Sequence, residues 1–145
     1  MVPLSNNLVP RDASACLIIT HNDNYILQLR DNSTDIFFPN RLGLFGGAIE
    51  VSETPLQAVV REVHEELSAF FPAERYKSCG QINLICDGLE LTRYFFILRV
   101  SPLERKSFVL TEGQRLEELS GEQLLKRRLT PYDEYFLYMQ IKKFI

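Results

Sequence analysis

The chain has 145 residues, of which 46% are hydrophobic and 24% charged, which is the size and balance of one soluble globular domain over residues 1–145. Its net charge of −3 and its lack of a long basic run argue against nucleic-acid or membrane-surface binding, because both need concentrated positive charge. No apolar run approaches membrane-spanning length, and the N-terminus has no basic segment followed by an apolar one. A soluble protein that does not associate with membranes is therefore expected.

The cysteines give a second constraint. Cys16, Cys79 and Cys86 are odd in number and contain no C-x-x-C pair. A disulfide framework or a zinc site is therefore not expected, and the cysteine usage fits a reducing cytoplasm. We expect a cytoplasmic protein.

The first part of the chain alternates between extended segments and connections. We expect extended segments over 16–20, 25–30 and 41–47, joined by a turn at 21–24 and a loop over 31–41. In the second of these segments Tyr25, Leu27 and Leu29 lie on one side, as in a strand with one buried face.

A helix is predicted next. Thr54 suits the N-cap, Pro55 suits the first helical position, and Gln57 completes a T-x-x-Q capping box. Apolar residues then recur at helical spacing, at Leu56, Val59, Val60, Val63 and Leu67. This helix has one apolar side to bury.

The second half adds further strands and helices. Residues 78–86 and 90–100 are typical of two strands, and Asp87-Gly88 between them is a strong hairpin turn signal. We expect a short strand and a loop within 108–119, a short helix over 121–127, and a last helix that opens at Thr130-Pro131. The order of strands, helix, strands and helix predicts an α/β fold in which helices cover a mixed sheet.

Three carboxylates share one side of the first predicted helix. At about 100° per residue, Glu66 and Glu65 lie about 40° and 60° to either side of Glu62. Close like charges destabilise a helix by a few tenths of a kcal/mol per pair, a penalty that a hard divalent cation removes. Arg61 gives partial relief to Glu65 at i,i+4 and could reach back to Glu53. Taken alone, such a run is more often the solvated face of a surface helix.

The residues before the glutamates make the pattern specific. Five residues separate Gly47 from Glu53, and seven more separate Glu53 from Arg61-Glu62-Val63-His64-Glu65-Glu66. This spacing resembles the box of the MutT-like Nudix hydrolase superfamily, which it matches at Gly47, Glu53, Arg61, Glu62, Val63, Glu65 and Glu66. The resemblance implies an α/β/α sandwich with a mixed β-sheet, in which the box forms a loop, a helix and a loop.

The resemblance also implies roles for the matched residues. Glu62 and Glu66 would be the main ligands of Mg²⁺ or Mn²⁺, Glu65 would bind directly or through water, and the Gly46 carbonyl would join them. Glu53 and Arg61 would form a supporting pair that holds the helix against its loop. The implied reaction is hydrolysis of a diphosphate bond, because such metals neutralise phosphate charge and activate water, and a carboxylate can take the proton of that water.

Two positions depart from the family pattern. Ser68 stands where the family has a glycine, and Ala69 is small where the family has a bulky aliphatic residue. A left-handed serine costs on the order of 1 kcal/mol, so we expect a local change in how the helix ends rather than a lost site. Just before the box, Leu42 and Phe45 hold positions that are Trp and Pro in many relatives.

The general base is open between the box glutamates and three later acids, Glu112, Glu117 and Glu118. We favour Glu112, because Gly113 after it predicts a tight loop that could approach a ligand. For any one of the three, a solvated surface acid is an equally good interpretation.

Residues outside the box are candidates for substrate binding. Arg30 ends a strand expected near the box and could bind phosphate, although a plain surface arginine is the commoner case. Phe37, Phe38 and Phe45 could stack a base or close over a substrate, but aromatic side chains beside a loop more often join a satellite core. The side chains of Tyr132, Tyr135, Phe136, Tyr138 and Met139 on the last helix are interpreted as packing or as a homodimer surface.

Two functions remain open from the sequence. The first is hydrolysis of a small-molecule nucleoside diphosphate linked to another moiety, such as a nucleotide sugar or a nucleoside triphosphate. The second is a nucleotide-binding or regulatory module without turnover. The complete set of Glu62, Glu65 and Glu66 favours the hydrolase, because an inactive module has no need of the charge cluster.

Overall fold

The computed structural model describes residues 11–86 and 88–143. Within these residues the strands form one seven-stranded mixed sheet. The strands are β1 (Ala13–Thr20), β2 (Tyr25–Leu29), β3 (Leu42–Gly43), β4 (Phe45–Ala48), β5 (Tyr76–Cys86), β6 (Leu89–Val100) and β7 (Arg115–Leu119). The helices are α1 (Pro55–Leu67), the 3₁₀ turn η2 (Ala73–Arg75), α2 (Pro102–Lys106), α3 (Gly121–Leu124) and α4 (Pro131–Ile141).

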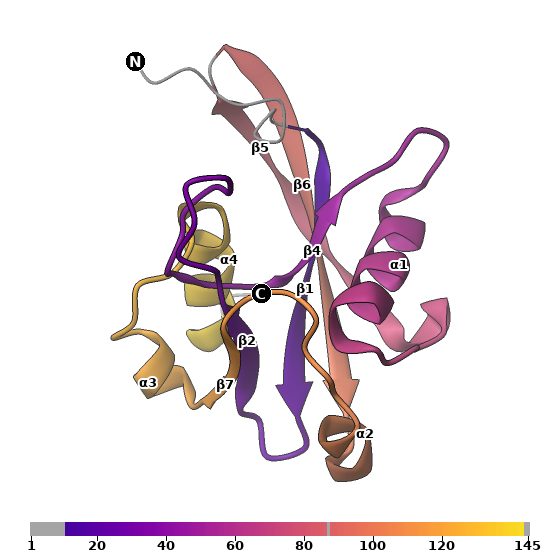
Figure 1. Ribbon diagram of the computed structural model, residues 1–145, viewed down its shortest axis with the longest axis vertical. Coiled ribbons are helices and arrows are strands. Elements are labelled where there is room, and N and C mark those ends of the chain that lie inside the picture. The colour runs from indigo at the N-terminus through magenta and orange to yellow at the C-terminus, as the bar shows by residue number, and fades with distance from the viewer. Residues whose placement is uncertain (1–10, 87, 144–145) are drawn as a thin grey trace.

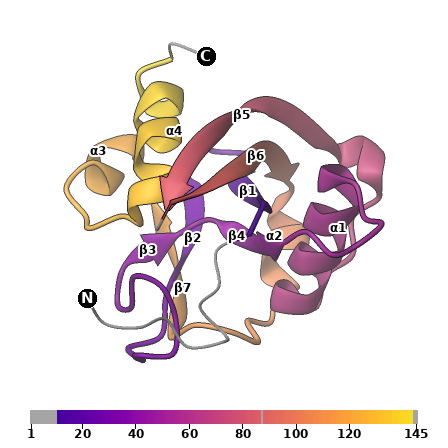
Figure 2. The same cartoon turned by 90° about the horizontal axis from the view of Figure 1, so that it is seen from above.

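Strand β1 organises the sheet. It runs parallel to β6 and antiparallel to β2 and β4, within the order β3-β2-β1-β6-β5, while β7 pairs with β2. Helix α1 covers one face of the sheet, and α3 and α4 cover the other (Figures 1 and 2). The predicted mixed α/β/α sandwich is confirmed.

Successive residues of β1 enter two different hydrophobic cores. Leu17 and Ile19 belong to the core beneath α3 and α4, whereas Cys16 and Ile18 belong to the core beneath α1. Strand β2 also has two buried faces, because Ile26 packs under α1 while Leu27 lies in the other core. The prediction of one buried face for β2 was therefore incomplete: both sides of a sheet between two helical layers must be apolar.

Helix α1 begins as the sequence predicts. The Thr54 hydroxyl accepts from the Gln57 amide at 3.1 Å, and the Gln57 side chain accepts from the Thr54 amide at 2.9 Å. The helix ends at Ser68, which itself takes the left-handed conformation with φ 53° and ψ 31°. The expected change in the helix end was wrong, because Ser68 adopts the conformation that a glycine usually supplies, and its amide donates to the His64 carbonyl.

The second half differs from the prediction in detail. Helix α2 was not predicted, although Ser101 and Glu104 form the S-x-x-E capping box that marks its start. The predicted β5–β6 hairpin is confirmed, with Gly88 at φ 78°, while Asp87 of its turn lies outside the described residues. None of the described helices is long and apolar enough to cross a membrane.

Candidate active site

Glu66 lies buried near the C-terminal end of α1, on the side of the helix that faces the sheet. Its side chain is 1% exposed, and its two oxygens accept from the Gly46 amide and from Gln28 Nε2, each at 2.8 Å. Burial raises the pKa of Glu66 to about 8, against the lowering effect of these two hydrogen bonds. A carboxyl group held in this way sits at the junction of α1, β2 and β4.

Glu62 lies one turn earlier and packs against the glycine-bearing strand. A Cβ at position 47 would stand 2.6 Å from Glu62 Oε1, so the glycine makes room for this carboxylate. Arg61 Nη1 donates to Glu62 Oε1 at 2.9 Å. Burial raises the pKa of Glu62 by more than this contact lowers it.

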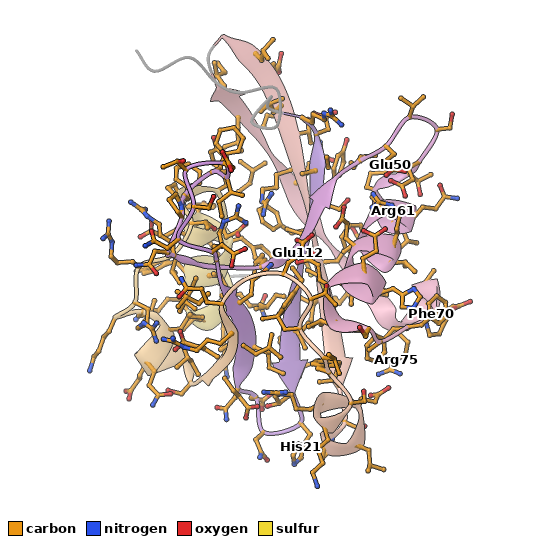
Figure 3. The ribbon with its side chains drawn as sticks, viewed as in Figure 1. His21, Glu50, Arg61, Phe70, Arg75 and Glu112 are labelled. Atoms are coloured by element: carbon orange, nitrogen blue, oxygen red, sulfur yellow. The ribbon has the colours of Figure 1, made fainter. Side chains whose placement is uncertain are left out.

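Arg61 connects α1 to the preceding loop. Its Nε and Nη2 donate to the two oxygens of Glu53 at 2.7 and 2.9 Å, and Nη2 also donates to the Ala48 carbonyl at 3.1 Å. The hydrogen bond from Arg61 is the main reason that the pKa of Glu53 falls to about 2. Figure 3 shows Arg61 and Glu50 together on this side of α1, where Arg61 Nη1 lies 3.8 Å from Glu50. Glu53 and Arg61 therefore form the expected ion pair.

Glu65 lies outside this buried arrangement. Its side chain is 58% exposed, and its Oε2 lies 3.4 Å from Arg61 Nη1. Glu65 thus shares the acidic side of α1 with Glu62 and Glu66 but faces solvent. It can approach a ligand only from the rim of the site.

The loop that carries Glu112 is fixed at both ends. The Thr111 amide donates to the Glu66 carbonyl at 2.9 Å, and the Gln114 amide donates to the Leu29 carbonyl at 2.7 Å. Gly113 has φ +83°, and a Cβ there would stand 2.9 Å from the Leu29 carbonyl oxygen. The predicted tight loop is therefore present, and Figure 3 shows Glu112 on it at the centre of the molecule, between α1 and β2.

Glu66 and Glu112 line the same cavity. This acidic cavity has a volume of about 300 Å³ and is lined by Gln28, Arg30, Asp31, Ile36, Gly46, Glu66, Glu112 and Gly113. Among the described residues, no three acidic, histidine or cysteine side chains converge closely enough to hold a metal ion as they stand. As they stand, Glu62 accepts from Arg61, and Glu66 accepts from Gly46 and Gln28.

The donor set nevertheless suits a hard divalent cation. Every candidate ligand offers oxygen, and each carboxylate oxygen has more than one acceptor position. The protein hydrogen bonds to Glu66 therefore leave acceptor positions on both of its oxygens. Glu62 would have to turn from Arg61 to complete such a site.

A second cavity adjoins the first through Arg30 and Gly46. It has a volume of about 250 Å³, and we call it the arginine cavity because Arg11, Arg30 and Arg93 line it. Its apolar and aromatic walls include Phe37, Phe38, Leu44, Leu84, Leu91 and Tyr132. Such a cavity combines apolar walls with charged donors, as small-molecule sites do.

Arg30 lies between the two cavities. Its Nε donates to the Phe37 carbonyl at 2.9 Å, which fixes the guanidinium against the 31–41 loop. Burial is the main reason that the pKa of Arg30 is lowered, with Arg93 acting in the same direction. Arg30 is therefore placed where it could contact a ligand that spans both cavities.

The aromatic candidates divide into two groups. Phe37 and Phe38 line the arginine cavity, and the Phe38 ring meets Tyr132 edge-on at 5.1 Å. Phe45 was wrongly predicted as a substrate-binding residue: it is fully buried in the core beneath α1. Because side chains alternate along β4, Phe45 packs toward the helix while Gly46 faces the cavities.

The remaining acidic candidates are held elsewhere. Glu117 accepts from both Nη atoms of Arg127, and Glu118 accepts from Arg105 Nε at 3.2 Å. Neither lines the acidic cavity, in contrast to Glu112. Of the aromatic residues on α4, Phe136 stacks on Phe95 at 4.4 Å in the core.

Several cavity residues carry no signal in the sequence, among them Arg93 and Asp133. Tyr132, which also lines the cavity, was interpreted as packing or as a homodimer surface. Arg93 Nε donates to Asp133 Oδ1 at 2.8 Å, yet the two residues are 40 positions apart in the sequence. No local pattern could have joined them.

Comparison with known proteins identifies the family. The NUDIX domain family model matches residues 10–137, so the chain belongs to the Nudix family. The 8-oxo-dGTP diphosphatase of Escherichia coli (strain K12) is 43% identical over 49 residues, which are 34% of this chain and 38% of that enzyme. The match thus spans well under half the length of that relative, and it supports a MutT-like assignment.

Solved structures agree with the fold. The MutT protein from Methanosarcina mazei Go1 has a TM-score of 0.72 at 19% identity, over 93% of this chain and 96% of that chain. The NUDIX domain of Shewanella oneidensis NrtR, solved with ADP ribose, has a TM-score of 0.68 at 15% identity, over 93% and 88%. At these identities the likeness concerns the fold alone.

Proposed function

We propose that this protein is a metal-dependent pyrophosphohydrolase of nucleoside diphosphate derivatives. The substrate would be a nucleoside diphosphate linked to another moiety, such as a nucleotide sugar or a nucleoside triphosphate. The observation that carries the proposal is the shared lining of the acidic cavity: Glu66 and Glu112 face one space, and Arg30 and Gly46 line both this cavity and the arginine cavity. A ligand that spans both would place a charged group at the glutamates and a planar group between aromatic walls.

Mg²⁺ or Mn²⁺ would be held by Glu62, Glu65 and Glu66, with the Gly46 carbonyl as a further oxygen ligand. When bound, such a cation neutralises the charge of a diphosphate and lowers the pKa of water. The chain's own residues supply the rest. Arg30 binds and orients a phosphate group, Glu112 accepts a proton from the attacking water, and the Glu53–Arg61 pair holds α1 against its loop.

Two relatives are consistent with this substrate class. One is named for its action on 8-oxo-dGTP, and another was solved with ADP ribose. Both compounds contain a diphosphate linkage attached to a nucleoside. Homodimer formation and a cytoplasmic location remain predictions.

A binding module without turnover is the second candidate. It is favoured by the lack of a converged three-residue metal arrangement among the described residues, and by the protein donors on both Glu66 oxygens. In that case the two cavities would bind a nucleotide, and the carboxylates would serve to hold β4 and β2 against α1.

A substrate screen separates the two candidates. Nucleoside triphosphates, 8-oxo-dGTP, nucleotide sugars and ADP-ribose would be tested with Mg²⁺ and Mn²⁺ on wild type, Glu66→Gln and the exposed control Glu122→Gln. If the protein is a hydrolase, wild type and Glu122→Gln should release product, and Glu66→Gln should not. Equal release by all three proteins would contradict it. If nothing is hydrolysed but one compound raises the melting temperature, the binding module is correct.

A further inference from the structure

Asp133 holds Arg93 at one wall of the arginine cavity. Asp133 is 1% exposed at the start of α4, and its Oδ1 accepts from Arg93 Nε at 2.8 Å. Its Oδ2 accepts from the Thr130 hydroxyl at 2.6 Å and from the Leu44 amide at 3.1 Å. Three donors from three segments therefore fix the carboxylate, and the carboxylate fixes the guanidinium.

Among the described residues, the attachment through Nε leaves the other end of the guanidinium without a protein hydrogen bond. Within residues 11–86 and 88–143, the hydrogen bonding of Arg93 to protein runs through Nε, and its Cζ lies 6.0 Å from the Phe95 ring centroid. The Nη1 and Nη2 groups are planar, fixed donors on a residue that lines the cavity. An oriented pair of donors is suited to two acceptors on one edge of a ligand.

The charged lining of the cavity is rich in donors and poor in acceptors. It comprises Arg11, Arg30 and Arg93 against the single carboxylate of Asp133, whose two oxygens are both already engaged. A guanidinium has five donors and no acceptor. A ligand edge opposite Arg93 that carried a donor would therefore meet another donor, which is costly in a partly buried site.

The walls of the same cavity favour a planar ligand. Phe37, Phe38 and Tyr132 line it, and such rings stack well on a base. We propose that Arg93, positioned by Asp133, determines substrate specificity by selecting bases that present two acceptors on one edge. The 6-oxopurines do so at O6 and N7, whereas 6-aminopurines present a donor at N6. This proposal rests on the proposed function, because it takes the arginine cavity as the nucleoside end of the substrate site.

Binding of nucleoside monophosphates tests this proposal without any turnover. The affinities of GMP, IMP and AMP would be measured by calorimetry on wild type and on Arg93→Met/Asp133→Asn. The double variant is used because Arg93→Met alone would leave a buried carboxylate without its cation. Wild type should bind GMP and IMP about tenfold tighter than AMP, and the double variant should bring the ratio to within about twofold.

Two further variants complete the design. Arg99→Met removes an arginine from the same strand, where Arg99 is 65% exposed and pairs with Asp23, so its GMP-to-AMP ratio should equal that of wild type. Asp133→Asn alone keeps Arg93 but removes the charge that orients it. It should reduce the ratio by an intermediate amount, which a merely structural effect on both ligands would not do.

Several results would overturn the proposal. One is equal affinity of wild type for GMP and AMP, and another is no measurable binding of GMP, IMP or AMP. A third is a double variant that melts normally and keeps the GMP-to-AMP affinity ratio of wild type. Loss of inorganic pyrophosphate binding in the double variant with an unchanged base ratio would assign Arg93 to phosphate instead, which also overturns it. If the ratio behaves as expected but no nucleotide is hydrolysed with Mg²⁺, the hydrolase proposal fails while the base selection stands.

Discussion

The carboxylate of Glu62 occupies the space that a side chain at Gly47 would need. A Cβ at this position would stand 2.6 Å from Glu62 Oε1 and 2.7 Å from its Cδ. Carbon and oxygen atoms that are not bonded do not approach so closely without strain. A glycine is therefore needed at position 47 because it leaves room for Glu62. At position 46 a glycine is needed for a different reason, because the backbone there has φ +138°.

Gly47→Ala should impair function more than stability. The new Cβ meets the flexible end of a glutamate side chain, so Glu62 can move aside while the strand stays in place. A displaced ligand or positioning group can cost on the order of 100-fold in rate. We expect kcat/KM to fall by 10- to 100-fold, with a melting temperature within a few degrees of wild type. Activity within twofold of wild type would mean that Glu62 need not lie against Gly47.

Gly46→Ala, in contrast, should impair stability more than function. Its Cβ would stand 2.0 Å from the Ser14 carbonyl oxygen, which belongs to the backbone of β1 and cannot move without breaking the β1–β4 pairing. The left-handed φ adds strain for any residue with a side chain. We expect a loss of at least ~3 kcal/mol of unfolding free energy, measured by urea denaturation. A variant that unfolds at the wild-type urea concentration would show that β4 adapts.

Features determined by nearby residues were predictable from the sequence. The start of α1 follows from Thr54 and Gln57, three positions apart, and the Arg61–Glu53 pair spans eight positions. Helix α2 carries the same kind of signal in Ser101 and Glu104. Local hydrogen bonds leave a local pattern, so these parts of the site can be inferred before the fold is known.

Features determined by the fold were not predictable. Whether Phe45 faces a ligand or the core depends on the register of β4 against β1, and its glycine neighbours give no periodicity to read. The Arg93–Asp133 pair joins β6 to α4 across 40 positions, and nothing around either residue indicates the other. The arginine cavity therefore had to come from the structure, whereas the glutamates of α1 could be identified from the sequence.

Glu112→Gln should remove catalysis and leave the fold intact. Its loop is fastened through the backbone of Thr111 and Gln114, which the substitution does not alter. General base catalysis contributes about 10²- to 10⁴-fold, so kcat should fall by that amount on whichever compound the screen identifies. The matched variant Glu118→Gln changes a glutamate on β7 that pairs with Arg105 outside the acidic cavity, and it should keep wild-type kcat. If Glu112→Gln retains more than a third of kcat, Glu112 is not the general base.

The burial of Glu66 should make stability depend on pH when divalent cations are removed by EDTA. The pKa of Glu66 is about 8 in the folded protein, against an ordinary value of 4.5, because burial disfavours the charged form. The folded state therefore binds this proton more tightly than the unfolded state. Its contribution to stability is fully present below pH 4.5, is lost as the pH rises to 8, and amounts to at most about 5 kcal/mol.

Glu66→Gln isolates this effect, because glutamine does not titrate. Melting temperatures measured in EDTA should fall for wild type between pH 5 and pH 8 and should change less for Glu66→Gln, so that the variant becomes the more stable protein at pH 8. The carboxyl groups of Glu53 and Glu104, whose pKa values lie near 2 because of their arginine partners, titrate below this range. Adding Mg²⁺ should raise the wild-type melting temperature more at pH 8 than at pH 6, since a cation competes with the proton for Glu66. Parallel melting curves for wild type and Glu66→Gln in EDTA would show that Glu66 is already ionised at neutral pH.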